Sequence, residues 1–277
     1  MDIENLGSIT QKLLVFGGPY SNLAATMALR ARADKLDIPA ERIICTGDIV
    51  AYCAEPEQTL ELIRQWGIHV VMGNCEEALA FSKSDCGCGF EADSSCSALA
   101  ITWYQYADSR VSVEQRRWMQ DLSRSIEFEV AGKGFKVVHG SLSSINEFVF
   151  SSSDTPDKLA QIRNAGVDAI IGGHCGIPFG QGIEELYWLN AGVIGMPAND
   201  GGSHGWYMLI DPIAGGAKVS WHRLDYDHTT SRRTTIAAGM AEYGQALLDG
   251  RWPNIDILPA TESRQSGQPL NLQALHI

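Results

Sequence analysis

Residues 42–48 read Arg42-Ile43-Ile44-Cys45-Thr46-Gly47-Asp48, a short apolar run that ends in a glycine and a carboxylate. An apolar run bounded by a turn signal predicts a buried strand. Similar runs ending in glycine occur at Leu13–Phe16 and at His69–Met72. Helical stretches separate the three runs; Asn22 is suited to cap the first and Pro56 to open the second. Three strand–loop–helix units predict a parallel sheet.

The remainder of the chain predicts further strands and helices. Two helical segments are expected between residues 99 and 122, then strands at 125–130, 135–138 and 169–172, and helices near 156–165 and 235–248. From residue 186 to 224, strands and turns alternate, which predicts a second, largely antiparallel sheet. The expected fold class is therefore α/β: a sandwich of two packed β-sheets flanked by helices on both sides.

The domain boundaries follow from composition. No repeat or linker interrupts residues 1–255, which are expected to form one domain. Residues 82–122 are expected to be an insertion, in which a Cys-rich loop at 82–97 precedes two helical segments. Residues 256–277 are polar and contain proline, which predicts a poorly ordered tail.

Composition excludes several classes of protein. The 277 residues include 33 acidic and 21 basic side chains, for a net charge of −12, and no basic cluster of the kind that binds duplex nucleic acid. No apolar run approaches the roughly 18 residues of a membrane span, and the first residues form no export signal. Seven cysteines are too few for a disulfide-stapled secreted domain, so reduced thiols and a cytoplasmic location are expected. A homo-oligomer is left open.

Polar side chains follow the predicted strands directly, each beside a glycine. They are Asp48, Asn74, His139 and His174. Because ligands bind at the carboxyl ends of strands in α/β sheets, these side chains are expected to converge. One carboxylate, one amide oxygen and two imidazoles suit Mn²⁺, Fe²⁺ or Zn²⁺ better than Ca²⁺ or Mg²⁺. The sequence therefore predicts a site for at least one divalent transition metal ion.

The order of these motifs, with Asn190-Ala191-Gly192-Val193-Ile194-Gly195-Met196-Pro197 after them, resembles the calcineurin-like metallophosphoesterase superfamily, particularly its small bacterial phosphodiesterases. The resemblance spans residues 12–225. It implies a helix-flanked two-sheet sandwich and a dinuclear metal centre that hydrolyses phosphomonoesters or phosphodiesters. It also implies that Asp48 bridges two ions and that Asn74, His139 and His174 bind one of them.

The ligands of the other ion are missing. Where the family has Asp-x-His-Gly-Asn, this chain has Gly18-Pro19-Tyr20-Ser21-Asn22, and where the family has Gly-His-x-His it has Gly173-His174-Cys175-Gly176. Gly18, Tyr20 and Gly176 thus stand at three ligand positions. Because the replacements fall on one side of the site, we expect a reorganised or single-metal centre.

Other residues receive roles in the same way. The family's Gly-Asn-His-Asp/Glu motif reads Gly73-Asn74-Cys75-Glu76, so Cys75 replaces the histidine that assists the leaving group, and Cys75 or Glu76 is the candidate proton donor. Glu76 equally suits helix capping. The remaining candidates are Cys86, Cys88 and Cys175 as additional thiolate ligands, and Tyr20 and Asn22 as substrate-binding residues. Small buried fillers are the alternative for Cys75 and Cys175, and a purely structural role is the alternative for Cys86 and Cys88.

The resemblance implies a metal-dependent phosphoesterase acting on a small phosphorylated molecule. Two other functions fit the replaced ligands. One is a non-catalytic protein that binds or senses a nucleotide or phosphate, and the other is a thiol- or iron-binding protein on the same fold.

Overall fold

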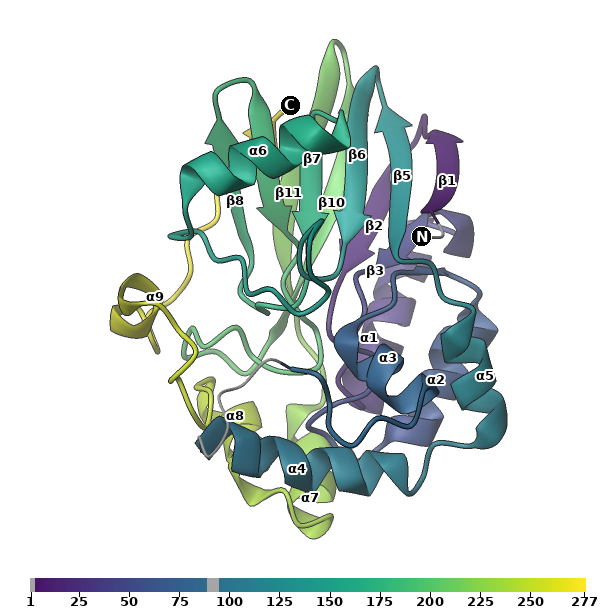
Figure 1. The fold of residues 1–277 in the computed structure, drawn as a ribbon, viewed down its shortest axis with the longest axis vertical. Coiled ribbons are helices and arrows are strands. Elements are labelled where there is room, and N and C mark those ends of the chain that lie inside the picture. Colours follow the sequence, from purple (N-terminus) through teal and green to yellow (C-terminus); the bar gives the residue numbers. More distant parts are fainter. Residues whose placement is uncertain (1–2, 89–94) are drawn as a thin grey trace.

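The computed structural model describes residues 3–88 and 95–277 and contains two six-stranded sheets (Figure 1). The first sheet has the order β1-β5-β6-β7-β9-β8, with bounds β1 (Ile3–Ser8), β5 (Ser125–Val130), β6 (Lys133–Val138), β7 (Ala169–Gly172), β9 (Leu186–Asn190) and β8 (Phe179–Ile183). The second has the order β12-β11-β10-β2-β3-β4, with bounds β12 (Leu275–His276), β11 (Gly216–Leu224), β10 (Gly205–Ile213), β2 (Leu13–Phe16), β3 (Ile43–Cys45) and β4 (His69–Val70).

Helices cover the outer faces of the sheets. Helix α6 lies on the outer face of the first sheet, and α4, α7 and α8 gather at one end of the molecule (Figure 1). The bounds are α1 (Leu23–Lys35), α2 (Pro56–Trp66), α3 (Asn74–Ala80), α4 (Ser95–Asp108), α5 (Val113–Gln120), α6 (Thr155–Ala165), α7 (His228–Ala237), α8 (Ala241–Asp249) and α9 (Ala260–Arg264), with a 3₁₀ turn at Ala40–Arg42. No described helix is long and apolar enough to cross a membrane.

The core lies in three layers, because side chains alternate between the two faces of a strand. In β2, Leu13 and Val15 join the core between the two sheets, whereas Leu14 and Phe16 pack under the helices of the second sheet. In β7, Ile170 faces α6 on the outer side of the first sheet. The four-layer arrangement of helices, two sheets and helices confirms the predicted fold class.

The division of strands between the sheets differs from the prediction. Strands β10 and β11 do not form a separate antiparallel sheet; β10 pairs antiparallel with β2, which itself pairs parallel with β3. Strand β9 belongs to the other sheet, parallel to β7. Both sheets therefore contain parallel and antiparallel pairs. The prediction missed this because the pairing partner of β10 is a strand almost 200 residues earlier in the chain.

Two local predictions also change, and a third is described only in part. The single helix expected at 235–248 is two helices, α7 and α8. The tail expected at 256–277 contains α9 and the edge strand β12, and the buried side chains of Leu258 and Ile277 anchor it. Part of the loop expected at 82–97 lies outside the described residues.

Candidate metal centre

Four buried side chains bring ligand atoms to one point between the sheets. Asp48 and Asn74 follow β3 and β4 of the second sheet, and His139 and His174 follow β6 and β7 of the first. Nε2 of His139 lies 3.0 Å from Oδ1 of Asn74, 3.2 Å from Nδ1 of His174 and 3.3 Å from Oδ2 of Asp48. Nδ1 of His174 lies 4.0 Å from Oδ2 of Asp48. The four residues that the sequence singled out therefore converge, and three of them form a candidate ligand group.

The backbone at two of these residues is unusual. Asp48 and His174 have φ of 56° and 39°, in the left-handed region that residues other than glycine seldom adopt. Such conformations persist where the surrounding structure holds them, and they cluster at functional sites. Here the two turns bring a carboxylate oxygen and an imidazole nitrogen within 4.0 Å of each other.

The hydrogen bonds around the cluster leave acceptor atoms facing one another. Nδ1 of His139 lies 2.7 Å from the carbonyl oxygen of Thr46, which can only accept, so this nitrogen carries the hydrogen. Nε2 of neutral His139 therefore presents a lone pair. Nδ2 of Asn74 donates to the carbonyl of Cys86 at 2.9 Å, which turns Oδ1 toward His139.

Lone pairs on four buried acceptors repel one another unless a cation lies between them. Ligands about 2.0–2.2 Å from a shared ion are themselves about 3.0–3.6 Å apart, which is close to the spacings within this cluster. Two imidazoles, a carboxylate and an amide suit Zn²⁺, Mn²⁺ or Fe²⁺. The described residues therefore fit one divalent transition metal ion.

The charges within the cluster agree with a site that exchanges a proton for a metal ion. Burial raises the pKa of Asp48, but the adjacent His139 more than offsets burial and brings this pKa down to about 2. Burial lowers the pKa of His139, and the carboxylate of Asp48 reverses the direction, so the pKa is raised above the ordinary histidine value. Burial and His139 together lower the pKa of His174 to about 3. A single proton on His139 thus takes the place of the cation.

Glu76 stabilises the loop that carries Asp48. One carboxylate oxygen accepts from the N–H groups of Asp48 at 2.7 Å and Gly73 at 3.0 Å, and the other accepts from Ile49 at 2.7 Å and Val50 at 3.3 Å. Burial, followed by the charge of Asp48, raises the pKa of Glu76 to about 7. Because both oxygens accept from backbone N–H groups, these contacts favour the capping role of Glu76, and its role as proton donor stays a prediction.

Cys75 and Asn22 are both buried. Cys75 lies beside Asp48, with its N–H 3.4 Å from Oδ1, and burial raises the pKa of its thiol well above the ordinary value. The side chain of Asn22 caps α1 at Ala25, accepts from Ser231 at 2.7 Å and donates to the carbonyl of Gly195 at 2.8 Å. These contacts confirm the predicted role of Asn22 as a helix cap and do not support its predicted role in substrate binding.

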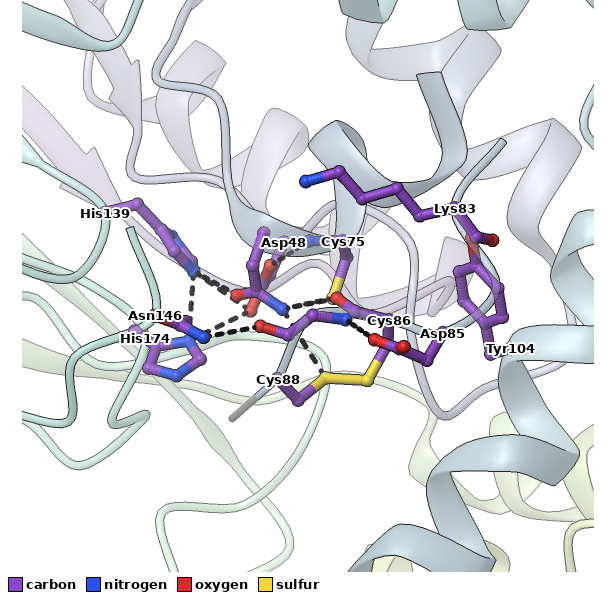
Figure 2. The surroundings of a disulfide bond; sticks show 12 residues. Asp48, Cys75, Lys83, Asp85, Cys86, Cys88, Tyr104, His139, Asn146 and His174 are labelled. Carbon is purple, nitrogen blue, oxygen red and sulfur yellow. Dashed lines mark hydrogen bonds and ion pairs between the residues drawn. A yellow bond between two sulfur atoms is a disulfide. The ribbon is translucent and has the colours of Figure 1, made fainter. Parts of the chain in front are cut away.

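Cys86 and Cys88 form a disulfide, so neither is a thiolate ligand and the expectation of reduced thiols does not hold for this pair. Figure 2 shows the disulfide beside Asp48, Cys75 and both histidines. Nδ2 of Asn74 lies 3.4 Å from Sγ of Cys88, which couples the disulfide loop to the cluster. Sγ of Cys175 accepts from Asn190 at 3.2 Å, and no sulfur joins the ligand group in the described part of the chain. A thiolate-bound metal is therefore not supported.

Tyr20 fills space on the side of the missing ligands. Its side chain is buried, and it lines a cavity together with His174 and Gly176. A Cβ placed on Gly176 would lie 3.7 Å from Oη of Tyr20, and one placed on Gly18 would clash with the ring of Tyr20. The three residues at the replaced ligand positions are therefore neighbours in space.

Sequence reasoning missed several residues that shape the site. The carbonyl of Thr46 orients His139, and the ring of Phe148 lies against His174 with centroids 4.1 Å apart. Tyr52, Tyr243 and Trp252 line the cavity beside Tyr20. Tyr52 follows a predicted strand and could have been singled out, but the others lie on elements whose approach to the site no local pattern indicates.

Comparisons with known proteins agree with this geometry. Residues 21–212 match the calcineurin-like phosphoesterase superfamily domain, and because the match covers more than half of the chain, the chain belongs to this metal-dependent superfamily. An uncharacterised protein of Methanocaldococcus jannaschii is 26% identical over 261 residues, covering 88% of this chain and 100% of the relative.

Two solved structures share the fold. A hypothetical protein from Pyrococcus horikoshii superposes with a TM-score of 0.73 at 17% identity, covering 87% of this chain and 99% of that one. A metallophosphoesterase from Sphaerobacter thermophilus superposes with a TM-score of 0.66 at 19% identity, covering 87% of this chain and 100% of the other. The resemblance inferred from the motifs is thus confirmed at the level of family and fold.

Proposed function

We propose that the protein hydrolyses phosphodiesters of small molecules with the help of one divalent transition metal ion. Asp48, Asn74, His139 and His174 would hold the ion. The observation that carries this proposal is the convergence of four buried acceptor atoms on one point, in a chain that belongs to a phosphoesterase superfamily. When bound, such an ion polarises a phosphoryl oxygen and lowers the pKa of a water molecule.

The reaction consumes one water molecule. The oxygen of water forms a bond to phosphorus, and the bond from phosphorus to the alcohol oxygen breaks while that oxygen takes up a proton. Cys75 is the proposed source of that proton, since burial keeps its thiol protonated and it stands where the family has a histidine. The proton lost by the attacking water then returns to the thiolate, so that the sum is diester plus water giving monoester plus alcohol.

Phosphodiesters are favoured over phosphomonoesters by charge. A phosphomonoester carries close to two negative charges near neutral pH, whereas a diester carries one. The described residues of the cluster and of the adjoining cavity include no lysine or arginine that could offset a second charge. A singly charged ester therefore suits this acidic site better.

The test combines a metal count with turnover. Purified protein is loaded with Mn²⁺, Fe²⁺ or Zn²⁺, the metal per chain is measured, and hydrolysis of bis-p-nitrophenyl phosphate is followed. We expect one ion per chain, and we expect H174A to lose both the ion and the turnover. The matched control is H222A, a change to a histidine of β11 outside the cluster. Wild-type turnover in H174A would overturn the proposal.

A second candidate is a protein that binds a phosphate-bearing molecule without hydrolysing it. The position of Tyr20 favours this candidate, because the ring fills space where the family has ligands of another ion. Ligand-induced thermal shifts, measured over a panel of phosphoesters that show no turnover with any of the three metals, would support binding without catalysis.

A further inference from the structure

A cavity of about 70 Å³ adjoins the ligand cluster and shares His174 with it. The cavity is lined mainly by apolar and aromatic side chains, among them Tyr20, Tyr52, Phe148, Met196, Tyr243 and Trp252. A single buried water occupies roughly 10–15 Å³, so this space exceeds that of one water several-fold. The cavity is therefore large enough for part of a substrate and is chemically unlike the polar cluster beside it.

Aromatic rings form two of its walls. Tyr52 lies between Tyr20 and Tyr243, with ring centroids 4.7 Å and 4.9 Å apart respectively. On another side, Phe148 packs against the imidazole of His174 at 4.1 Å. Aromatic pairs in such arrangements contribute about 0.5–1.5 kcal/mol beyond the burial of their area. A flat aromatic group in the cavity could pack against the faces and edges of these rings at centroid distances similar to those among the rings themselves.

The cavity extends into the space left by the missing ligands. Gly176 stands where the superfamily motif has a histidine, and a Cβ built there would lie 3.4 Å from the ring of Trp252. Because Gly176 has no side chain, the volume beside Trp252 and Tyr20 stays open. The side of the centre that lacks a second set of ligands is thus the side that offers an apolar binding surface.

The charge of the cavity limits its occupant. The described lining contains no lysine or arginine. The cavity therefore suits an uncharged group and would not hold a second phosphate.

We propose that this cavity binds the aromatic alcohol of a phosphodiester while the phosphate lies at the ligand cluster. This inference rests on the proposed function and specifies its substrate class: phosphodiesters in which one alcohol carries a single aromatic ring.

The test measures binding of the free alcohol, which needs no hydrolysis. Phenol and cyclohexanol, matched in size, are titrated by calorimetry into the wild-type protein, W252L, W252F and the control W118L. Trp118 is a half-buried tryptophan of α5 that does not line the cavity. We expect phenol to bind at least fivefold more tightly than cyclohexanol, W252L to weaken phenol at least fivefold, and W252F and W118L to retain affinity within twofold.

The outcomes separate this inference from the proposed function. Phenol binding that depends on the ring at position 252 supports the cavity assignment, even if no ester is hydrolysed. Equal affinities of the wild-type protein for phenol and cyclohexanol would overturn the cavity assignment, even if bis-p-nitrophenyl phosphate is hydrolysed. Equal affinities of W252L and W118L for phenol would also overturn it. If W252L does not fold, intermolecular nuclear Overhauser effects between phenol and the wild-type protein decide instead: effects to the ring protons of Tyr20, Tyr52 or Tyr243 support the cavity, and their absence rejects it.

Discussion

Some polar side chains at this site contribute ligand atoms, and others form hydrogen bonds to the backbone turns that carry the ligands. Glu76 belongs to the second kind, since its carboxylate accepts from four backbone N–H groups, three in the turn at residues 48–50 and one at Gly73. Glu77, its neighbour, instead pairs with Lys83 and Arg124 at the surface. The two glutamates follow each other in the sequence, yet their contributions to stability should differ greatly.

We expect E76Q to lower the free energy of unfolding by about 2–4 kcal/mol, because an amide nitrogen would then face backbone donors that lose their acceptor. Urea denaturation measures the change. The matched control, E77Q, removes only surface ion pairs and should cost about 1 kcal/mol or less. Equal losses in the two variants would contradict the role assigned to Glu76.

The pH dependence of metal binding follows from His139 and Asp48. The raised pKa of His139 stabilises the metal-free protein below the ordinary value of about 6.5, and this contribution is lost as pH rises through the folded-state pKa. The pKa of Asp48, lowered to about 2, adds stability above about 3.9 that is lost as the pH falls toward 2. His139 should therefore contribute more to the stability of the metal-free protein at pH 5.5 than at pH 8, whereas Asp48 contributes equally at both.

Since a metal ion must displace the proton of His139, the rise in melting temperature on adding Mn²⁺ should be larger at pH 8 than at pH 5.5, by several degrees. Differential scanning calorimetry at both pH values measures it. H174A, which lacks one ligand, serves as the control and should respond little at either pH. A Mn²⁺ effect of the same size at both pH values would argue against proton–metal exchange at this site.

Among the elements, α1 depends on one residue outside it. Asn22 caps the helix and also bonds Gly195 and Ser231, which are more than 170 residues away in the sequence. N22A should lower the free energy of unfolding by about 2 kcal/mol, since it removes a cap and leaves buried partners unpaired.

Chemical denaturation and steady-state kinetics test this prediction together. S112A, which removes the cap of α5 at a more exposed position, should cost about 1 kcal/mol or less. N22A should leave the KM for bis-p-nitrophenyl phosphate unchanged. A raised KM with no loss of stability would restore Asn22 as a substrate-binding residue.

The sequence predicts an element well when its own residues determine it, and poorly when a distant part of the chain does. Strands such as β5 and β7 were predicted with their observed bounds, because their apolar patterns are self-contained. Strands β1 and β8 were missed, since the first is an exposed polar edge strand and the second contains two glycines. Which sheet β10 joins depends on β2, and no local pattern carries that information.

The same distinction applies to the site. Asp48, Asn74, His139 and His174 were predicted because each directly follows a strand, and strand ends meet by topology. Glu76 and Asn22 were given chemical roles, although Glu76 accepts from backbone groups and Asn22 bonds Gly195 and Ser231, partners that only the fold brings near. The disulfide between Cys86 and Cys88 escaped prediction because cysteine density describes a whole chain and not one pair.

For the whole molecule, the cluster joins two halves of the sandwich. Asp48 and Asn74 come from one sheet and both histidines from the other, so a bound ion would tie the sheets together. Binding at 100-fold excess over the dissociation constant adds about 2.7 kcal/mol to the folded state. Amides at the ends of strands in both sheets should therefore become protected from hydrogen exchange together when the ion binds.

Hydrogen exchange with and without Mn²⁺ tests this expectation. Protection should rise together at the N–H of Asp48, which bonds Glu76, and at the N–H of Gly173, which bonds the carbonyl of His139. Amides of β12, at the far edge of the second sheet, serve as the internal reference. Protection confined to one sheet would place the ion elsewhere.

The exposed turn at Ala131 and Gly132 divides the ligands evenly, with Asp48 and Asn74 before it and the two histidines after it. A chain nicked at that turn would yield two fragments, each with only half of the donors that an ion needs. Capture of a coloured ion such as Co²⁺ would then signal that the fragments had reassociated correctly, and the metal centre would serve as an optical reporter of complementation.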